Sequence, residues 1–512
     1  MKQVKEIIHA SPLPSHVQAF YNTELYKHPT GSIEMIQTHI SWVFLTGNFV
    51  YKLKKPVDLG FLDYSTLEKR KFYCEQELLL NRRLMPDVYL EVCSVCLCEG
   101  EYNLSGDGEV IDYCLKMVQF DQAGLFDKML EQGEFKPEWM DTLAKDIAFF
   151  HAQAEVNSNP SFKHASYIEE HIQANLNVAA AHIEKALSEK NLKLLRSFAK
   201  TELEHKQVAL KERLVHQHIR HCHGDLHFRN ITLWEGKPRA FDCIEFNDEY
   251  RIIDTMNDVA FLLMDCDAHK RADLGMRFLS RYLEHSADYD GLSLLSLYLF
   301  YRASVRGKVA CILADELSCE QQEPQWQEAR DYFNLALSYT QKNKPTLFAI
   351  GGLSGSGKSH LALLGCGVEN AIVIRSDATR KRISINFPER DLYGDQMGND
   401  TYQAMFDAAK VALEAGFSVI MDATFLQSDS RQQVYDLAKN TKCPMHFYWL
   451  EVAENTLRHR IKKRIEVNKD ISDADLDVLS LQLAKYEKPN EPWIHCLDSS
   501  DSWINIDRKR LD

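Results

Sequence analysis

Residues 352–359 constrain the fold of this chain more than any other stretch of its sequence. They read GLSGSGKS and fit the pattern G-x-x-x-x-G-K-[ST]. The apolar run TLFAI at residues 346–350 comes before them, and a helical pattern follows. Glycines at such a turn let backbone N–H groups surround a phosphate at the N-terminus of the helix. The stretch therefore predicts a buried strand, a phosphate-binding loop and a helix, in that order.

The residues of this loop have different expected roles. The ammonium of Lys358 can bridge the β- and γ-phosphates of a nucleotide, and the hydroxyl of Ser359 can ligate Mg²⁺. Backbone N–H groups are expected to hold the β-phosphate. The residues expected to bind the nucleotide are Gly352, Ser354, Gly355, Ser356, Gly357, Lys358 and Ser359.

Apolar runs and helical patterns alternate after the loop. The runs AIVIRSD, SVIMDAT and MHFYWLEV each suit a buried parallel strand. This rhythm predicts an α/β domain with a doubly wound parallel sheet. The polar break QKNKP, which ends at Pro345, comes before it and places the expected domain boundary near residue 343. We expect this domain to occupy residues 343–512.

Two of these predicted strands lead into carboxylates. Asp377 follows the first run and Asp422 closes the second. Ligands bind at the carboxyl ends of the strands in an open α/β sheet. At that edge Asp377 can accept the proton of a substrate hydroxyl, and Asp422 can hold Mg²⁺ through water. Capping of a following helix is the alternative role for each carboxylate.

The second half resembles a group of small P-loop kinases whose relatives include zeta-toxin-like and polynucleotide-kinase-like enzymes. The resemblance covers about residues 345–500 and is carried by GGLSGSGKS, SDATRKR, DATF, RHRIKKR and SDADLDVLSLQ. It implies that Asp377 acts on the acceptor hydroxyl. It also implies that Arg460 and Arg464, which lie four residues apart on one helix face, belong to a lid that holds phosphates. A solvated charged face is the alternative for this pair.

The first half carries a second motif that is typical of phosphoryl transfer. His223-Gly-Asp-Leu-His-Phe-Arg-Asn230 is followed by the segment Phe241-Asp-Cys-Ile-Glu245. This arrangement resembles the catalytic core of the aminoglycoside phosphotransferase and choline-kinase branch of the protein-kinase-like fold. The resemblance implies that Asp225 accepts the proton of a substrate hydroxyl and that Asn230 and Asp242 hold Mg²⁺. A turn with polar capping residues is the alternative.

The same fold requires a lysine on an N-lobe strand and a glutamate on the adjacent helix. Lys52 in FVYKLKKP and Glu77 in YCEQELLLNRRL fit these positions, with Lys54 and Glu75 as the alternatives. The segment QTHIS contains no G-x-G-x-x-G, so the loop that covers the phosphates must differ from that of protein kinases. We expect an α+β bilobal protein-kinase-like domain over residues 1–342, with an N-lobe at about 30–120 and a helical C-lobe at about 121–335.

Composition limits the classes of partner and compartment. The 512 residues include 60 Lys and Arg against 74 Asp and Glu, a net charge of −14. Such a chain is not expected to bind duplex DNA non-specifically, although a local basic groove could be formed by Arg375, Arg380, Lys381 and Arg382. No apolar stretch is long enough to span a membrane, and the first residues do not resemble a secretory signal. The sequence gives no sign of a particular oligomeric state.

The cysteines point to a reducing compartment. Their number, 13, is odd and they are scattered, which indicates free thiols and a cytoplasmic protein. Cys93, Cys96 and Cys98 could supply thiolates to zinc, but no second Cys or His pair follows at metal spacing. We therefore expect these three to be small buried residues on a hairpin.

Together the two resemblances imply two Mg²⁺- and ATP-dependent phosphotransferases in one chain, each acting on a hydroxyl of an unidentified small molecule. One alternative is that one half binds nucleotide only to regulate the other. Another is that the second half acts on the ends of nucleic acids, which requires a basic groove beside Asp377.

Overall fold

The computed structural model describes residues 13–60, 62–157, 159, 163–341, 343–467, 475–498 and 503. The first residues, on which the expectation about a signal segment rests, lie outside these ranges, as do the first three residues of SDADLDVLSLQ. Among the described residues, no helix is both long and apolar enough to cross a lipid bilayer.

The N-terminal lobe is built on an antiparallel sheet of six strands in the order β1-β2-β3-β6-β4-β5. Helix α2 (Leu67–Asn81) packs against β4 and β6, and Thr66 caps it by accepting a hydrogen bond from the Lys69 N–H. Three short helical turns precede the sheet: α1 (Ser15–Gln18), η1 (Ala19–Tyr21) and η2 (Thr23–Leu25). The strands are β1 (Glu34–Gln37), β2 (Ser41–Leu45), β3 (Phe49–Lys54), β4 (Tyr89–Cys98), β5 (Glu101–Leu104) and β6 (Glu109–Val118).

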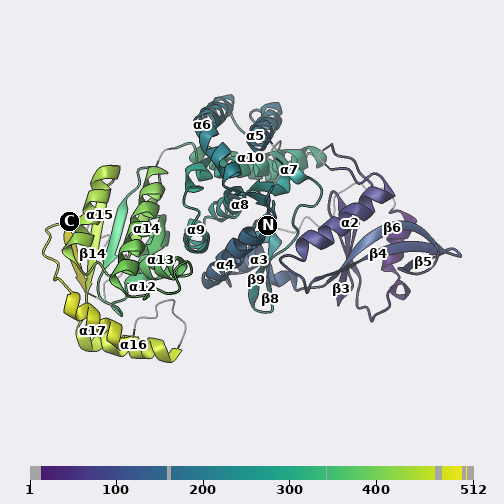
Figure 1. The fold of residues 1–512 in the computed structure, drawn as a ribbon. Coiled ribbons are helices and arrows are strands. Elements are labelled where there is room, and N and C mark those ends of the chain that lie inside the picture. The colour runs from purple at the N-terminus through teal and green to yellow at the C-terminus, as the bar shows by residue number, and fades with distance from the viewer. Residues whose placement is uncertain are drawn as a thin grey trace.

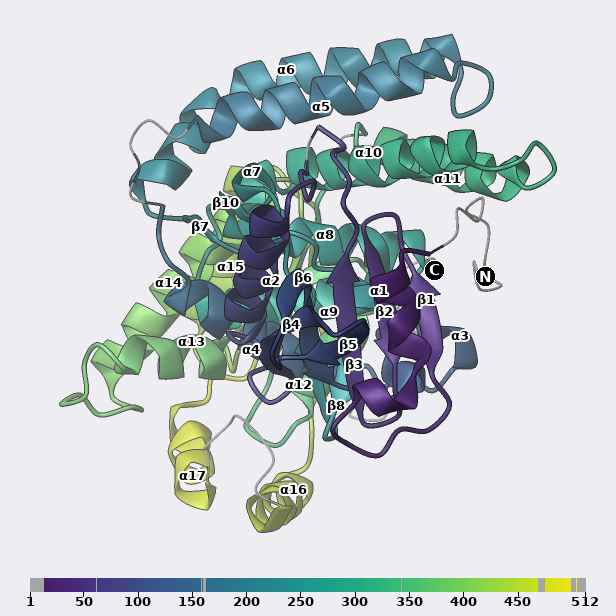
Figure 2. The same cartoon turned by 90° about the vertical axis from the view of Figure 1, so that its right-hand side faces the viewer.

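The next part of the chain is mainly helical and lies between the two sheets (Figure 1). Long helices pair here, α5 with α6 and α10 with α11 (Figure 2). Two short antiparallel pairs, β7 with β10 and β8 with β9, carry the motif region. The helices are α3 (Phe126–Gln132), α4 (Glu138–Gln153), α5 (His164–Ala181), α6 (Glu189–Val215), α7 (Asp248–Arg251), α8 (Thr255–Ala268), α9 (Ala272–Ser286), α10 (Leu292–Glu316) and α11 (Gln322–Ser338). The remaining elements are η3 (Gln122–Gly124), η4 (Phe228–Asn230), β7 (Ile219–His221), β8 (Ile231–Trp234), β9 (Lys237–Ala240) and β10 (Ile252–Asp254).

The C-terminal part contains a parallel sheet of five strands in the order β12-β13-β11-β14-β15. Its first strand, β11, lies between β13 and β14, so the chain changes direction across the sheet at this strand. Such a switch point opens a crevice at the carboxyl ends of the strands. The strands are β11 (Leu347–Gly351), β12 (Ala371–Arg375), β13 (Ser418–Asp422), β14 (Met445–Glu451) and β15 (Ile494–Asp498). The helices are α12 (Lys358–Val368), α13 (Ser376–Ser384), α14 (Asp395–Glu414), α15 (Ser428–Thr441), α16 (Glu454–Val467) and α17 (Leu476–Lys485).

These two architectures confirm the expected fold class, an α+β bilobal kinase-like part followed by an α/β P-loop part. Helix α11 ends at Ser338 and β11 begins at Leu347, on either side of the expected boundary, and residue 342 lies outside the described residues. The halves are packed together, because α9 contacts both α12 and the edge strand β12. One apolar core runs through both halves.

Two details of the fold concern residues singled out in the sequence. Strand β9 ends at Ala240, and Asp242 adopts a left-handed conformation with φ of 64° that turns the chain away from β9. Cys93 and Cys96 are buried on β4, as expected, while Cys98 is partly exposed. All three are free thiols, and among the described residues none belongs to a group with metal-ligand spacing.

Candidate active sites

A chain of ion pairs, buried except at the exposed carboxylate of Asp242, joins the N-lobe to the segment after β9. The Lys52 Nζ lies 2.7 Å from Glu77 Oε1 and 2.7 Å from Asp242 Oδ1. Burial opposes the charge on this lysine, but the Asp242 and Glu77 carboxylates raise its pKa well above the ordinary value. The left-handed turn at Asp242 thus brings its carboxylate to the lysine of β3, 190 residues earlier in the chain.

Lys54 takes part in the same network instead of replacing Lys52. Its Nζ lies 2.7 Å from Glu77 Oε2 and also pairs with Glu245, and its side chain is almost completely buried. Both lysines project from the same face of β3, so one glutamate serves both. Burial opposes ionisation of Glu77, but the two ammonium groups lower its pKa to about 2. Glu75, the alternative to Glu77, is exposed and lies near Lys71.

The catalytic-loop motif places Asp225 beside two partners. Asn230 Nδ2 donates to Asp225 Oδ2 at 2.8 Å, and His227 Nε2 lies 3.2 Å from the same oxygen. Burial opposes ionisation, but the His227 and His223 imidazoles lower the pKa of Asp225. Asp225 is therefore ionised at neutral pH and one-third exposed, as a proton acceptor requires. Sequence reasoning missed His227, which lies inside the quoted motif.

Buried carboxylates of α8 hold this loop in shape. Asp258 accepts hydrogen bonds from the backbone N–H groups of His223 (2.9 Å) and Gly224 (2.8 Å). His223 Nε2 lies 2.9 Å from the carbonyl oxygen of Phe241, next to Asp242. Asp254 caps α8 by accepting from the Met256 N–H. These contacts brace the catalytic-loop motif and the start of α8.

Three potential metal ligands lie close together around Asp258. Ligand atoms of His151, Cys222 and Asp258 all lie within 4.8 Å of one another. Both ring nitrogens of His151 are already engaged, with the Tyr282 hydroxyl at 2.9 Å and with Asp258 at 3.1 Å. Burial also raises the pKa of the Cys222 thiol well above its ordinary value, which disfavours a thiolate ligand. We therefore interpret these three residues as a buried hydrogen-bonded cluster and not as a metal site.

The second site is a cavity of about 1100 Å³ at the carboxyl ends of the parallel strands. The loop between β11 and α12 forms one wall, and its Gly352, Gly355 and Gly357 have φ values of 140°, 83° and 101°. L-residues rarely adopt these conformations, which suit the tight turns of a phosphate-binding loop. Lys358 and Ser359 line the cavity, and Lys358 Nζ donates to the carbonyl oxygen of Leu353 at 3.0 Å.

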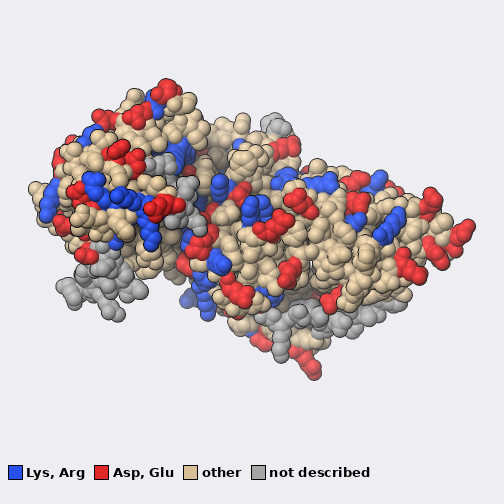
Figure 3. All heavy atoms as spheres, turned by 90° about the horizontal axis from the view of Figure 1, so that it is seen from below, with Lys and Arg blue, Asp and Glu red and all other residues tan. Residues whose placement is uncertain are grey.

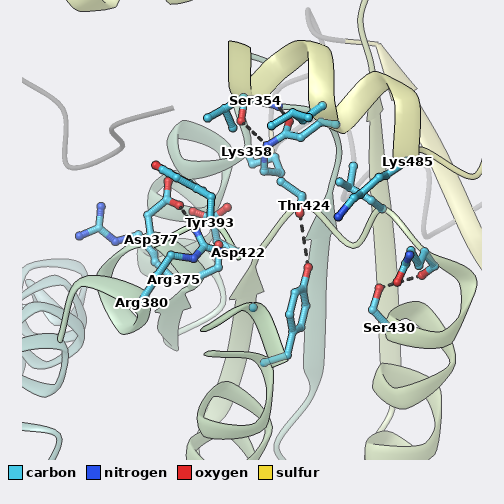
Figure 4. Close-up of a pocket in the computed structure, with 18 of the residues that line it drawn as sticks. Ser354, Lys358, Arg375, Asp377, Arg380, Tyr393, Asp422, Thr424, Ser430 and Lys485 are labelled. Atoms are coloured by element: carbon cyan, nitrogen blue, oxygen red, sulfur yellow. Dashed lines mark hydrogen bonds and ion pairs between the residues drawn. The ribbon is translucent and has the colours of Figure 1, made fainter. Parts of the chain in front are cut away.

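Both strand-end carboxylates line this cavity (Figure 4). Asp422 is the last residue of β13 and is buried, and burial raises its pKa although Lys358 and Ser359 oppose the change. Asp377 lies in the first turn of α13, where its Oδ1 is 3.1 Å from Arg380 Nη1. The alternative of helix capping fails for both: α13 has no side-chain cap, and α15 begins six residues after Asp422.

A pair of helices covers the phosphate loop. Arg460 and Arg464 of α16 line the cavity, and Arg460 Nη1 donates to the carbonyl oxygen of Ser356 at 3.2 Å. Gln482 of α17 makes two hydrogen bonds to Ser354, accepting from its backbone N–H and donating to its Oγ, both at 2.9 Å. No sequence signal marked Gln482, because a single glutamine on an amphipathic helix resembles any surface residue.

Two of the four cations expected in a basic groove beside Asp377 are paired with carboxylates. Arg375 pairs with Glu284 of α9, and Arg380 pairs with Asp377. Figure 3 shows basic and acidic side chains interspersed on the face seen from below, over both halves of the molecule. A groove for a polyanion needs several free cations in a row, and these two arginines do not supply them.

Both sites offer the donor atoms that Mg²⁺ and a nucleotide require. Asn230 and Asp242 in the first site, and Ser359 and Asp422 in the second, present hard oxygen donors, which Mg²⁺ prefers. The nitrogen of Asn230 is engaged by Asp225, so its amide oxygen is the atom left for a metal. The left-handed glycines and the lysine of the phosphate loop suit a nucleotide phosphate. The residues present therefore fit both groups.

Comparison with known proteins supports two joined units. Residues 347–489 match a family model described as an AAA domain. An uncharacterised protein of Mycobacterium tuberculosis (strain ATCC 25618 / H37Rv) is 28% identical over 464 residues, which span 89% of this chain and 91% of the relative. An uncharacterised protein of Mycobacterium bovis matches to the same extent. Because this match crosses both halves, the joined arrangement is shared with these relatives.

Solved structures resemble each half separately. A choline/ethanolamine kinase family protein from Mesorhizobium loti covers 64% of this chain and 97% of its own, with 11% identity and a TM-score of 0.37. A gluconokinase from Sinorhizobium meliloti 1021 covers 33% of this chain and 91% of its own, with 20% identity and a TM-score of 0.26.

Proposed function

We propose that this chain is a bifunctional Mg²⁺- and ATP-dependent phosphotransferase. Each half transfers the γ-phosphoryl group of ATP to a hydroxyl of its own small-molecule acceptor. The observation that carries the proposal is that each half has its own complete set of groups: a lysine for the phosphates, oxygen donors for Mg²⁺ and a carboxylate to receive the hydroxyl proton.

In the kinase-like half, Lys52 binds the phosphates while Glu77 holds its ammonium group in place. Asn230 and Asp242 hold Mg²⁺, which neutralises charge on the transferred group when it is bound. Asp225 accepts the proton of the acceptor hydroxyl, and its lowered pKa keeps it ionised for this task.

In the P-loop half, the backbone of residues 352–359 and the Lys358 ammonium hold the phosphates. Ser359 and Asp422 bind Mg²⁺, directly or through water. Asp377 accepts the acceptor proton, and Arg460 and Arg464 on the covering helix stabilise the charge of the transferred group. The pairing of Arg375 with Glu284 and of Arg380 with Asp377 favours a small acceptor over a nucleic-acid end.

Calorimetric titration of MgATP tests the proposal directly. Wild type is expected to show two sites, of which Lys358→Ala removes one and Asp242→Ala removes the other. Lys488→Ala is the matched control, because this lysine is exposed and paired only loosely with Glu451. A single site that Lys358→Ala abolishes would refute the bifunctional proposal and favour a regulatory role for the first half.

A further inference from the structure

Arg375 occupies a central place in the wall of the P-loop cavity. It is the last residue of β12, and it pairs in register with Asp422 at the end of β13. Its side chain is largely buried and lines the cavity beside Asp377 (Figure 4). An arginine in this place, with its guanidinium free, would be the natural ligand for a phosphate or carboxylate on an acceptor.

The guanidinium of Arg375 is instead engaged by the other half of the chain. Its Nη2 lies 2.6 Å from Glu284 Oε2, and its Nε donates to Glu284 Oε1. This is a two-point contact between a guanidinium and a carboxylate, the strongest common geometry for such a pair. Glu284 is buried near the C-terminus of α9, which belongs to the kinase-like half.

Glu284 is fixed in position from its own side. Arg281 Nη1 lies 2.8 and 3.0 Å from the two Glu284 oxygens. Arg281 in turn contacts Asp141 of α4, which also holds Arg277 through two hydrogen bonds of 2.8 and 2.7 Å. The carboxylate that Arg375 meets is therefore part of a rigid network within the first half.

The surrounding interface holds β12 against α9. Ser280 of α9 accepts a hydrogen bond of 3.0 Å from the Val373 N–H, a backbone group on the outer edge of the parallel sheet. Ser280 also contacts the Cys366 thiol of α12 at 3.8 Å. The edge strand and its terminal arginine are thus set by contacts from the other half.

The rest of the cavity lining combines charged and uncharged polar residues, and the charged ones include Asp395, Asp429 and Lys485. Figure 4 shows Ser430 and Lys485 across the cavity from Asp377 and Arg380. Lys485 Nζ is paired with Asp395 at 2.9 Å. The uncharged polar residues that line the cavity from α14, α15 and the turn before α15 are Asn399, Gln403, Gln427, Ser430 and Gln433. Amides and hydroxyls of this kind hydrogen-bond to hydroxyl groups.

We infer that Glu284 is a specificity-determining positioning residue of the P-loop site: it holds Arg375 and occupies its guanidinium, so that the site accepts an uncharged polyhydroxy compound and not an anionic one. This inference rests on the proposed function, since it names the acceptor class of the same site. It also means that the P-loop site is incomplete without the kinase-like half.

The test measures binding of inorganic phosphate to the full chain saturated with MgADP, by calorimetry. Glu284→Gln frees the guanidinium of Arg375, so phosphate is expected to bind roughly tenfold or more tightly than to wild type. Glu284→Asp keeps the charge and is expected to stay within about twofold of wild type. Glu284→Gln combined with Arg375→Gln is expected to return to the wild-type affinity. Glu138→Gln, an exposed carboxylate near Arg277, is the control.

Unchanged phosphate affinity in Glu284→Gln, with MgADP binding retained, would overturn the inference. So would tighter binding that persists in the double variant. Arg375→Gln alone gives a second test that does not need the Glu284 variants to fold. It is expected to leave phosphate affinity unchanged, and a tenfold loss would show that Arg375 already binds anions. Phosphate binding requires no turnover, so these outcomes are distinct from failure of the proposed function, which the MgATP titration reveals.

Discussion

The two candidate sites differ in how their buried charges are compensated. In the kinase-like site, lysines and carboxylates from distant parts of the chain neutralise one another directly, as Lys52 does with Glu77 and Asp242. In the P-loop cavity, backbone groups on left-handed glycines form the binding wall, and Asp422 is buried with its pKa raised. Ion pairs between its own residues stabilise the first site. The second site is a cavity whose wall contains a buried carboxylate, Asp422, that burial makes harder to ionise.

This difference has a physical consequence for stability and for ligand binding. Breaking a buried ion pair leaves an uncompensated charge, so the first site should be sensitive to single substitutions. A buried carboxylate with a raised pKa costs stability until a cation binds beside it. The ionised Asp422 should therefore lower the unfolding free energy of the ligand-free chain.

The largest expected effects are on the rate of phosphoryl transfer. They should show which half catalyses each reaction. Asp225→Asn and Asp377→Asn are each expected to slow transfer by their own half by about 10²- to 10⁴-fold, because each removes the proton acceptor. Rates would be followed by ADP release with acceptors found separately for each half. Asp331→Asn, on the exposed face of α11, is the control. If either variant retains the full rate, that half does not catalyse the transfer measured.

The next largest effect should be on the stability of the kinase-like half. Lys54→Met removes the ammonium group that pairs with Glu77 and Glu245, so it is expected to cost about 3–5 kcal/mol. Lys71→Met, which removes an exposed ammonium 3.9 Å from Glu75, should cost less than about 0.5 kcal/mol. Urea denaturation monitored by circular dichroism gives both values. Equal costs would mean that the buried network does not stabilise the lobe.

Acid should weaken the same network. The pKa of Glu77 is lowered from 4.5 to about 2 in the folded chain, so its ion pairs stabilise the fold fully above pH 4.5. That contribution is lost as the pH falls from 4.5 toward 2. The difference in unfolding free energy between wild type and Glu77→Gln should therefore shrink as the pH falls from 4.5 toward 2. A difference that grows as the pH falls would contradict the ion-pair assignment.

The smallest effect should have the opposite sign and come from the P-loop cavity. Burial raises the pKa of Asp422 above 3.8, so its ionised form opposes folding at neutral pH. Asp422→Asn is expected to stabilise the nucleotide-free chain at pH 7 by less than Lys54→Met destabilises it, and this gain should fade as the pH falls. Thermal denaturation measures it, with the exposed Asp436→Asn as control. A lower melting temperature for Asp422→Asn would contradict this account.

Much of the fold and the composition of both sites could be predicted from local sequence. The glycine-rich loop, the alternation of apolar runs and the spacing from Asp225 to Asn230 each depend on neighbouring residues. The choice between Lys52 and Lys54 could not be made in this way. Both project from one face of β3, and only the position of Glu77 between them shows that both are used.

The sequence by itself determined which chemical groups are present and the order of the elements that carry them. Loop glycines, strand-end carboxylates and helix periodicity follow from interactions within a few residues. Only the tertiary structure decided which charges are available. Arg375 lies beside Asp377 in the sequence and looks like part of a basic groove, yet Glu284, 91 residues earlier, neutralises it. Long-range pairing of this kind arises from the packing of α9 on β12, which no local pattern records.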